Sequence, residues 1–219
     1  MPATKGYKGM GMEGGIARWY AKTTRKSLSD FQALAQRMAA NLSPGARVLE
    51  VAPGPGYFAI ELAKLGPFGV TGLDVSHTFV EIARRNAQEQ NVTVDFQQGN
   101  ASQMPFADES FDLIVCRAAF KNFSEPVRAL AEMRRVLRPG GKAVIIDLRR
   151  DTPQTEINKH IDAMDAGLLN AAFMKWTFRF MLLKRAYTRE DFEKMIAESG
   201  WQIYEIGQAP VGFEISLSK

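Results

Sequence analysis

Cysteine, histidine and long apolar runs are all scarce in this chain of 219 residues. Cys116 is the only cysteine, which excludes a disulfide within the chain and a cysteine-rich zinc site. The apolar runs are a few residues long, far short of the roughly 20 residues needed to cross a bilayer. No basic segment followed by an apolar one opens the chain as a secretion signal would. We therefore expect a protein of the cytoplasm that binds no metal and does not insert stably into a membrane.

A large excess of one charge is lacking too, since 28 basic and 24 acidic side chains leave a net charge of +4. Such a small excess does not require nucleic acid as a partner. With 46% hydrophobic and 24% charged residues the composition is typical of a globular protein. A chain of this length buries roughly 70% of its unfolded surface on folding. We expect residues 1–219 to form a single domain, and the sequence gives no indication of its oligomeric state.

Glycine, by contrast, is abundant at the N-terminus. The first fifteen residues, MPATKGYKGMGMEGG, hold five glycines and three methionines with no apolar period. Such a composition predicts a mobile N-terminal arm, which we place at residues 1–27. The aromatic residues Tyr7, Trp19 and Tyr20 lie in this arm. Two interpretations stay open, an arm that closes over a bound ligand and a frayed terminus.

Strand-like and helix-like segments alternate after the arm. The apolar segments that predict strands are 48–51, 70–74, 92–96, 111–116 and 143–147, followed by an antiparallel pair at 201–206 and 211–217. Helical patterns between the first five strands predict a parallel sheet that is covered on both faces. The fold class is therefore α/β, a Rossmann-like doubly wound sheet of seven strands, mostly parallel with an antiparallel C-terminal strand. Residues 149–186, charged and then aromatic, predict a helical cap inserted after strand 5.

A glycine turn follows the first predicted strand, in the segment VLEVAPGPGY at residues 48–57. In doubly wound sheets this turn lies where ligands bind, because glycine lets the backbone approach them closely. Asp74 ends the next strand, where an acidic residue receives the hydroxyls of an adenosine ribose. A nicotinamide-binding domain shares these features, and the spacing of Gly54, Gly56 and Ala59 matches its fingerprint. Two observations favour another ligand: Glu50 suits an ammonium group, and the prolines of the turn remove N–H groups that would bind phosphate.

The chain resembles the class I S-adenosylmethionine (SAM)-dependent methyltransferases of small molecules, the group that includes the enzymes of ubiquinone and menaquinone biosynthesis. The resemblance covers about residues 45–150. It rests on four motifs in the family's order, VLEVAPGPG, GLDVS, QGNASQMPFADESFDLIVC and EMRRVLRPGGKAVIID. It implies SAM as the methyl donor, S-adenosylhomocysteine as the released product, and a small acceptor that is apolar or aromatic.

The resemblance also implies which residues bind the donor. Glu50 matches the acidic residue near the methionine ammonium, Asp74 the one that binds the ribose hydroxyls, and Asn100 the position that faces the adenine amino group. The remaining positions of the implied donor site are Ala52, Gly54, Gly56, Val75, Phe79, Ala101 and Arg117, and we add Tyr20 of the arm. This chain departs from the family at Ala52, where glycine is usual, and at Asn100, where aspartate is usual. We expect donor binding to survive both changes, because alanine is small and the Asn100 amide keeps an acceptor oxygen.

Methyl transfer from a sulfonium needs alignment more than acid–base chemistry. For a phenol or alcohol acceptor we name His160, in the predicted cap, as the candidate base, and place His77 near the adenine or at the surface. Lys121 and Asn122 resemble the Arg-Asn pair of the quinone-biosynthesis enzymes. The segment CRAA after the fourth strand lacks the signatures of nucleic-acid methyltransferases. Two alternatives stay open: a non-catalytic regulator that binds SAM or a nucleotide, and, less favoured, an NAD-dependent oxidoreductase.

Overall fold

The computed structural model describes residues 6–8, 11–162 and 182–219. Its centre is a seven-stranded sheet in the order β3-β2-β1-β4-β5-β7-β6. The strands are β1 (Arg47–Val51), β2 (Gly69–Asp74), β3 (Asp95–Gln98), β4 (Phe111–Arg117), β5 (Leu137–Leu148), β6 (Ile203–Gln208) and β7 (Gly212–Ser218). Only β7 runs antiparallel to its neighbours β5 and β6. The predicted fold class is confirmed.

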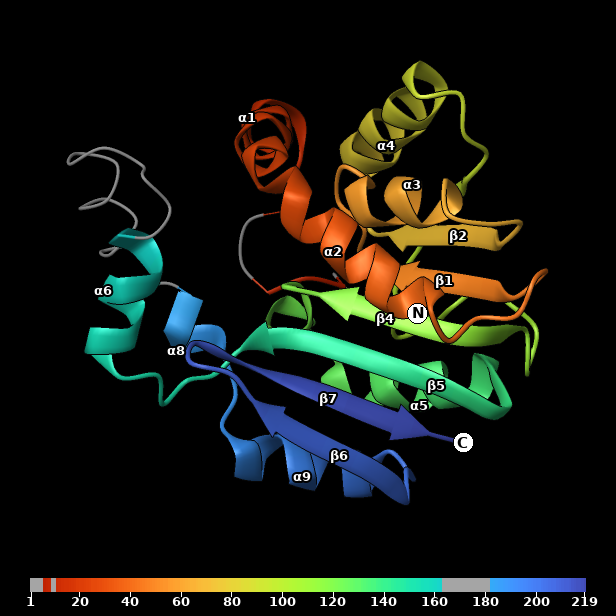
Figure 1. Cartoon of the computed structure of the whole chain (residues 1–219). Coiled ribbons are helices and arrows are strands. Elements are labelled where there is room, and N and C mark those ends of the chain that lie inside the picture. The colour runs from red at the N-terminus through yellow and green to blue at the C-terminus, as the bar shows by residue number, and fades with distance from the viewer. Residues whose placement is uncertain (1–5, 9–10, 163–181) are drawn as a thin grey trace.

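Helices cover both faces of the sheet (Figure 1). The α-helices are α1 (Gly14–Thr24), α2 (Leu28–Ala39), α3 (Tyr57–Ala63), α4 (His77–Glu89), α5 (Pro126–Val136), α6 (Gln154–Asp162), α8 (Leu183–Arg185) and α9 (Arg189–Glu198). In one core cluster, α2, α3 and α4 pack on the face of the sheet that carries the Val48 side chain. In the other cluster, α5 and α9 pack on the opposite face, which carries the Leu49 side chain. Adjacent residues of one strand are thus both buried, as expected of a parallel strand covered twice.

Figure 1 also shows where the chain surrounds the ends of the strands. Helices α1, α6 and α8 all lie on the side at which β1, β2, β4 and β5 end. The predicted insertion after strand 5 does contain helices, α6 and α8. The aromatic part of the predicted cap, residues 163–181, lies outside the described residues. In the described part of the chain, no helix is long and apolar enough to span a membrane.

The N-terminal segment differs from the sequence prediction, because residues Gly14–Thr24 of the predicted arm form the helix α1. Ala17 and Ala21 are buried on the inner side of this helix. The sequence did not predict the helix, because its apolar pattern is short and follows two glycines. Whether any part of residues 1–27 is mobile stays a prediction.

Strand boundaries also differ from the prediction, most of all at the starts of β3 and β5. Strand β3 begins at Asp95 and not at residue 92, because Asn91 has a φ of 54° and Val92 still donates to Ala87 of α4. Strand β5 begins at Leu137 and not at residue 143, and its pairing with β4 is irregular between Leu137 and Lys142, where the chain reads Arg-Pro-Gly-Gly. Helix α9 begins with a capping box, in which Thr188 and Asp191 make both of the hydrogen bonds of that motif.

Candidate functional site

The glycine turn after β1 bends through three residues with positive φ, Ala52 at 58°, Gly54 at 55° and Gly56 at 79°. The two glycines have different surroundings. A Cβ on Gly56 would lie 2.6 Å from Cζ of Phe96 and 2.9 Å from Cβ of Ala83, so Gly56 serves close packing. A Cβ on Gly54 would meet no described atom within 4 Å beyond its chain neighbours. Gly54 therefore faces open space at the edge of the sheet, where a ligand has room to approach its backbone.

Asp74, the last residue of β2, is fixed against this turn. Its Oδ2 accepts a hydrogen bond from the Gly54 N–H at 2.9 Å and its Oδ1 one from the Ser76 N–H at 2.9 Å. The side chain is buried, and this burial raises the pKa of Asp74 to about 6. The carboxylate is thus held in one position with lone pairs left for a further donor, such as a hydroxyl group.

Glu50 is a second buried carboxylate, one strand away on β1. Its Oε2 accepts from the Ala59 N–H at 3.0 Å. Burial raises the pKa of Glu50 to about 8; the Ala59 N–H and the positive charge of Arg117 oppose this rise, and the negative charge of Asp74 adds to it. Two buried carboxylates near each other favour a ligand that brings positive charge.

The arm lies against the start of α4, beside Asp74. The Ser76 hydroxyl donates to the Met12 carbonyl at 2.6 Å, and the Glu13 carboxylate accepts from the backbone N–H groups of His77 and Thr78 at 2.9 and 3.0 Å. The sequence analysis missed Met12 and Glu13, because nothing in their spacing marks contacts with residues more than sixty positions away.

Two aromatic residues of the predicted donor site meet at this place. The rings of Tyr20 on α1 and Phe79 on α4 are in edge-to-face contact, with centroids 5.7 Å apart. Val75, which the resemblance places at the adenine, is among the few exposed large apolar residues of the described chain. The His77 ring is exposed, with Nδ1 3.9 Å from Glu81, so the structure places it at the surface.

Asn100 follows β3 and lies next to the arm. Its Oδ1 accepts from the Ser102 N–H at 3.0 Å and from the Ser102 hydroxyl at 2.8 Å. Both lone pairs of the amide oxygen are therefore engaged within its own turn. A Cβ on Gly6 would lie 2.9 Å from the Asn100 side chain, so the arm passes directly over it. The roles assigned to Asn100 and Ala101 toward adenine stay predictions.

The ends of β4 and β5 carry the other charged groups of this edge. The guanidinium carbon of Arg117 lies 4.2 Å from the ring centroid of Phe31, on α2. Lys121 and Asp147 form a buried ion pair, with Nζ 2.8 Å from Oδ1, and Oδ2 accepts from the Lys121 backbone N–H at 2.8 Å. The sequence analysis did not single out Asp147, which is the penultimate residue of β5, whereas Asp74 is the last residue of β2.

Tyr7 of the arm reaches this second region. It forms an antiparallel bridge with Phe123, next to the hydrogen bond from the Lys8 N–H to the Asn122 carbonyl at 2.7 Å. Burial raises the pKa of the Tyr7 phenol, against the nearby positive charges of Arg185 and Lys121. The described parts of the arm thus contact α4 on one side and the segment after β4 on the other.

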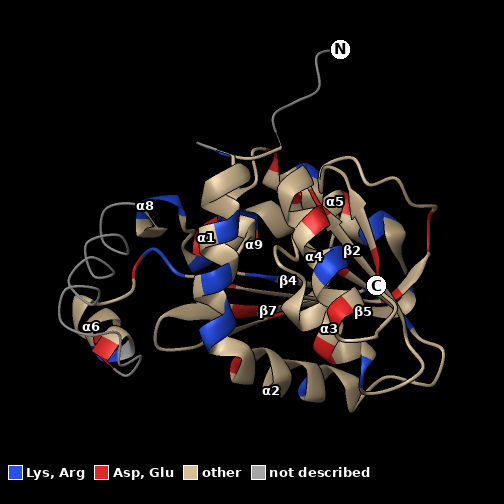
Figure 2. Ribbon diagram, turned by 90° about the horizontal axis from the view of Figure 1, so that it is seen from above, with Lys and Arg blue, Asp and Glu red and all other residues tan. Residues whose placement is uncertain are grey.

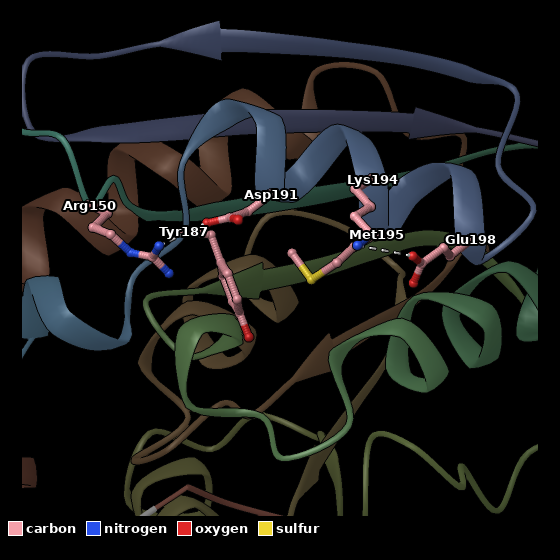
Figure 3. Close-up of a pocket in the computed structure, with 6 residues that line it drawn as sticks. All are labelled: Arg150, Tyr187, Asp191, Lys194, Met195 and Glu198. Atoms are coloured by element: carbon pink, nitrogen blue, oxygen red, sulfur yellow. Dashed lines mark ion pairs between the residues drawn. The ribbon is translucent and has the colours of Figure 1, made fainter.

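His160, the candidate base, belongs to α6, but its side chain is not among those described. Figure 3 shows a separate pocket of about 260 Å³ along α9, lined by Arg150, Tyr187, Asp191, Lys194, Met195 and Glu198. None of the predicted donor-site residues lines it. Its charges pair with one another, Arg150 with Asp191 at 3.3 Å and Lys194 with Glu198 at 3.9 Å, so we keep the candidate site at the strand ends.

Comparisons with known proteins show which family the chain belongs to. A family profile described as a methyltransferase domain matches residues 49–145, from β1 to β5. A demethylmenaquinone methyltransferase of Chlorobaculum parvum is 31% identical over 181 residues, which are 78% of this chain and 71% of the relative. One of Deinococcus radiodurans is 40% identical over 102 residues, but these span only 42% of that relative and 46% of this chain.

Among solved structures, a putative SAM-dependent methyltransferase from Methanococcus maripaludis superposes with a TM-score of 0.78. It is 23% identical and covers 97% of this chain and 95% of its own, which shows the shared fold. The domain match and the long alignment with the Chlorobaculum protein show more than a shared fold, because both include the turn after β1 and the strand that ends in Asp74. The chain therefore belongs to the family of SAM-dependent methyltransferases.

Proposed function

We propose that this protein transfers the methyl group of SAM to a small-molecule acceptor and releases S-adenosylhomocysteine. The observation that supports the proposal most directly is a combination of two features: space for a ligand at the Gly54 backbone, and two buried carboxylates, Glu50 and Asp74. SAM fits this combination because it has two ribose hydroxyls and carries an ammonium and a sulfonium charge. Asp74 would accept from the hydroxyls, and Glu50 would face the ammonium group.

The remaining donor contacts follow the same order along the sheet edge. The backbone from Ala52 to Gly56 would line the methionine part, with Arg117 nearby. Val75, Phe79 and Ala101 would enclose the adenine with Asn100, while Tyr20 would close the donor site from α1, where its ring already contacts Phe79. These roles are supported by the resemblance and by the closeness of the residues in the fold.

Bound SAM supplies a methyl group on a positively charged sulfur, so the leaving group is a neutral thioether. An electron pair of the acceptor atom would form the new bond to the methyl carbon while the S–C bond breaks and its electron pair stays on sulfur. The chain's own task is to align the acceptor in line with that bond and to exclude water. The arm, which contacts α4 and the segment after β4, suits the second task.

For the acceptor we propose an apolar or aromatic small molecule of the quinone type and not a nucleic acid, and for the protein a location in the cytoplasm. The names of the aligned relatives support this class. Where the acceptor is a phenol or alcohol, His160 is the proposed base for its proton. Unchanged kcat and pH profile in His160→Gln would remove His160 from the mechanism.

Calorimetric titration of S-adenosylhomocysteine, with NADH as the comparison ligand, tests the donor site first. Wild type is expected to bind S-adenosylhomocysteine and not NADH. Asp74→Asn should weaken binding about 100-fold, because two hydrogen bonds to a charged acceptor are lost or impaired. Asp95→Asn on the exposed end of β3 is the matched control and should bind as wild type does. Binding of NADH alone would overturn the proposal in favour of an oxidoreductase.

Methyl transfer is tested next, with methyl-labelled SAM and a panel of quinols and phenols. Label in an extracted acceptor, absent in Asp74→Asn, supports the proposed reaction. Donor binding without transfer to any acceptor of the panel favours the regulator, which uses the same fold without chemistry.

A further inference from the structure

The outer side of α1 and the turn that follows it carry an unusual set of exposed side chains. Trp19 is 60% exposed and Ile16 46%, and they lie three positions apart on one side of the helix. Four exposed basic residues surround them. We call this set the basic–aromatic face; its members are Ile16, Arg18, Trp19, Lys22, Arg25 and Lys26.

The orientation of α1 is fixed from its inner side. Ala17 and Ala21 are buried against the domain, and the Tyr57 hydroxyl donates to the Ala21 carbonyl at 2.9 Å. The Tyr20 ring packs on Phe79, as described above. With positions 17, 20, 21 and 24 turned inward, the helical period leaves Trp19 and the basic residues facing outward. Their exposure therefore follows from the packing and is not a frayed end.

Acidic groups are lacking on this face. Between Glu13 and Asp30 the chain has basic residues but no Asp or Glu. Figure 2 shows basic segments along the ribbon of α1 and no acidic one. Glu13 is turned to the backbone of His77 and Thr78. Within the described residues, none of the four basic side chains forms a salt bridge, whereas many basic residues elsewhere in the fold do. Among the described residues, these four positive charges thus have no ion-pair partner.

We propose that the basic–aromatic face docks the protein on an anionic phospholipid surface. Trp and Ile side chains on a helix favour the boundary between headgroups and acyl chains, and Lys and Arg beside them attract anionic headgroups. The inner side of α1 stays packed on the domain, so only the exposed tips enter the boundary and the protein binds at the surface without spanning the bilayer. Nucleic acid would explain the basic residues, but it gives no account of the exposed Ile16.

The position of α1 beside the candidate site determines which side of the protein would face the lipid. The helix lies on the side where the parallel strands end (Figure 1), next to the arm that contacts α4 beside the candidate site. A docked molecule would therefore hold this side of the sheet near the lipid, from which an apolar acceptor can be taken. The docking itself does not depend on the proposed reaction, because it needs neither donor nor acceptor.

Co-flotation of the full chain with vesicles tests the proposal. Vesicles of phosphatidylglycerol and phosphatidylcholine should bind the wild type, while pure phosphatidylcholine should bind it weakly. Lys22→Gln/Lys26→Gln should weaken binding about 30-fold, from about 1 kcal/mol for each charge near the surface. The matched control is Arg134→Gln/Lys142→Gln, which removes two exposed charges from α5 and β5 and should change binding little.

The aromatic contact is tested separately. Trp19→Ala should also weaken vesicle binding, whereas Tyr204→Ala, an exposed aromatic on β6, should not. Trp19 should report contact by a blue shift of fluorescence that is lost in Trp19→Phe. Thermal unfolding of every variant checks that the fold is kept.

Three results would overturn the proposal. In the first, the wild type floats equally with neutral and anionic vesicles, or with neither. In the second, the α1 variants and their controls lose the same amount of binding. In the third, sedimentation shows a dimer that Trp19→Ala dissociates, or single-stranded RNA binds the face while vesicles do not.

Discussion

The sheet edge proposed to bind the donor and the neighbouring edge at β4 and β5, which we call the donor edge and the acceptor edge, are built in different ways. The donor edge, at the ends of β1 and β2, is held by contacts between residues close in sequence, nine positions for Glu50 and Ala59 and 20 for Gly54 and Asp74. The acceptor edge, at the ends of β4 and β5, is reached by Lys8 of the arm, which bonds to Tyr187 across 179 positions. The two carboxylates of the donor edge are thus fixed by local contacts, whereas segments from opposite ends of the chain meet at the acceptor edge.

The charges of the two edges differ as well. At the donor edge the buried carboxylates Glu50 and Asp74 have no lysine or arginine hydrogen-bonded to them among the described residues. At the acceptor edge Asp147 is neutralised by Lys121 within the fold. The donor edge is therefore arranged for a positively charged ligand, while the charge of Asp147 is already satisfied by the protein itself.

The largest effect is expected from breaking the acceptor-edge pair. Lys121→Met leaves the Asp147 carboxylate buried without its cation and should lower the free energy of unfolding by about 3–5 kcal/mol. The double variant Lys121→Met/Asp147→Asn should recover part of this loss, since the uncompensated charge is gone. Urea unfolding measures both. Equal stability of the single and the double variant would contradict a charge-based role for the pair.

A second prediction separates the two glycines of the donor turn. Gly56→Ala places a Cβ against Phe96 and Ala83 in a backbone with positive φ, and should lower the free energy of unfolding by about 2–4 kcal/mol. Gly54→Ala faces open space and should cost only about 1 kcal/mol of strain. It should instead weaken S-adenosylhomocysteine binding about tenfold, because the new methyl group occupies ligand space.

Calorimetry and urea unfolding of both glycine variants provide the measurement. If Gly54→Ala binds as tightly as wild type, the ligand does not approach the backbone there. If Gly56→Ala unfolds at the wild-type urea concentration, the close packing described above does not stabilise the fold.

The difference between local and long-range contacts also explains which features of the fold and the site could be predicted from the sequence. The Gly54 turn, Asp74 and the succession of strands along the chain were predictable, because strand, turn and helix follow one another within 30 residues and the proposed chemistry needs glycine and a carboxylate there. The contacts of Met12, Glu13 and Tyr7 were not, since a bond between distant segments leaves no periodic pattern. Helix α1 was missed because its apolar contacts are alanines and its start is glycine-rich.

A third prediction uses the protonation of the donor edge. The pKa of Glu50 is raised to about 8 in the folded protein from an ordinary 4.5. The folded state therefore holds a proton that the unfolded state has lost, and the free energy of unfolding should fall as pH rises from about 4.5 to about 8. Binding of the ligand ammonium favours the ionised carboxylate. The affinity for S-adenosylhomocysteine should accordingly rise, about tenfold between pH 6.5 and 8.

Glu50→Gln is the control for this pH effect. Its amide oxygen can still accept from the Ala59 N–H, but the side chain no longer titrates. The variant should bind more weakly, with an affinity that is flat over the same pH range. A slope equal to that of the wild type would assign the titration to another group, with Asp74, whose pKa is about 6, as the next to test.

The smallest effect concerns the arm, which connects the two edges. Deletion of residues 1–13 removes the bonds to Ser76, His77 and Asn122 but leaves helix α1 in place. If the arm closes over the donor, the dissociation rate of S-adenosylhomocysteine should rise about threefold to tenfold, while the association rate changes little. Stopped-flow displacement measures both rates. Glu13→Ala, which loses only the contacts at α4, should give an intermediate rate, because the bridge at Phe123 still holds the arm at the acceptor edge. Rates equal to the wild type in both variants would mean that the arm is a frayed terminus and that the two edges work independently.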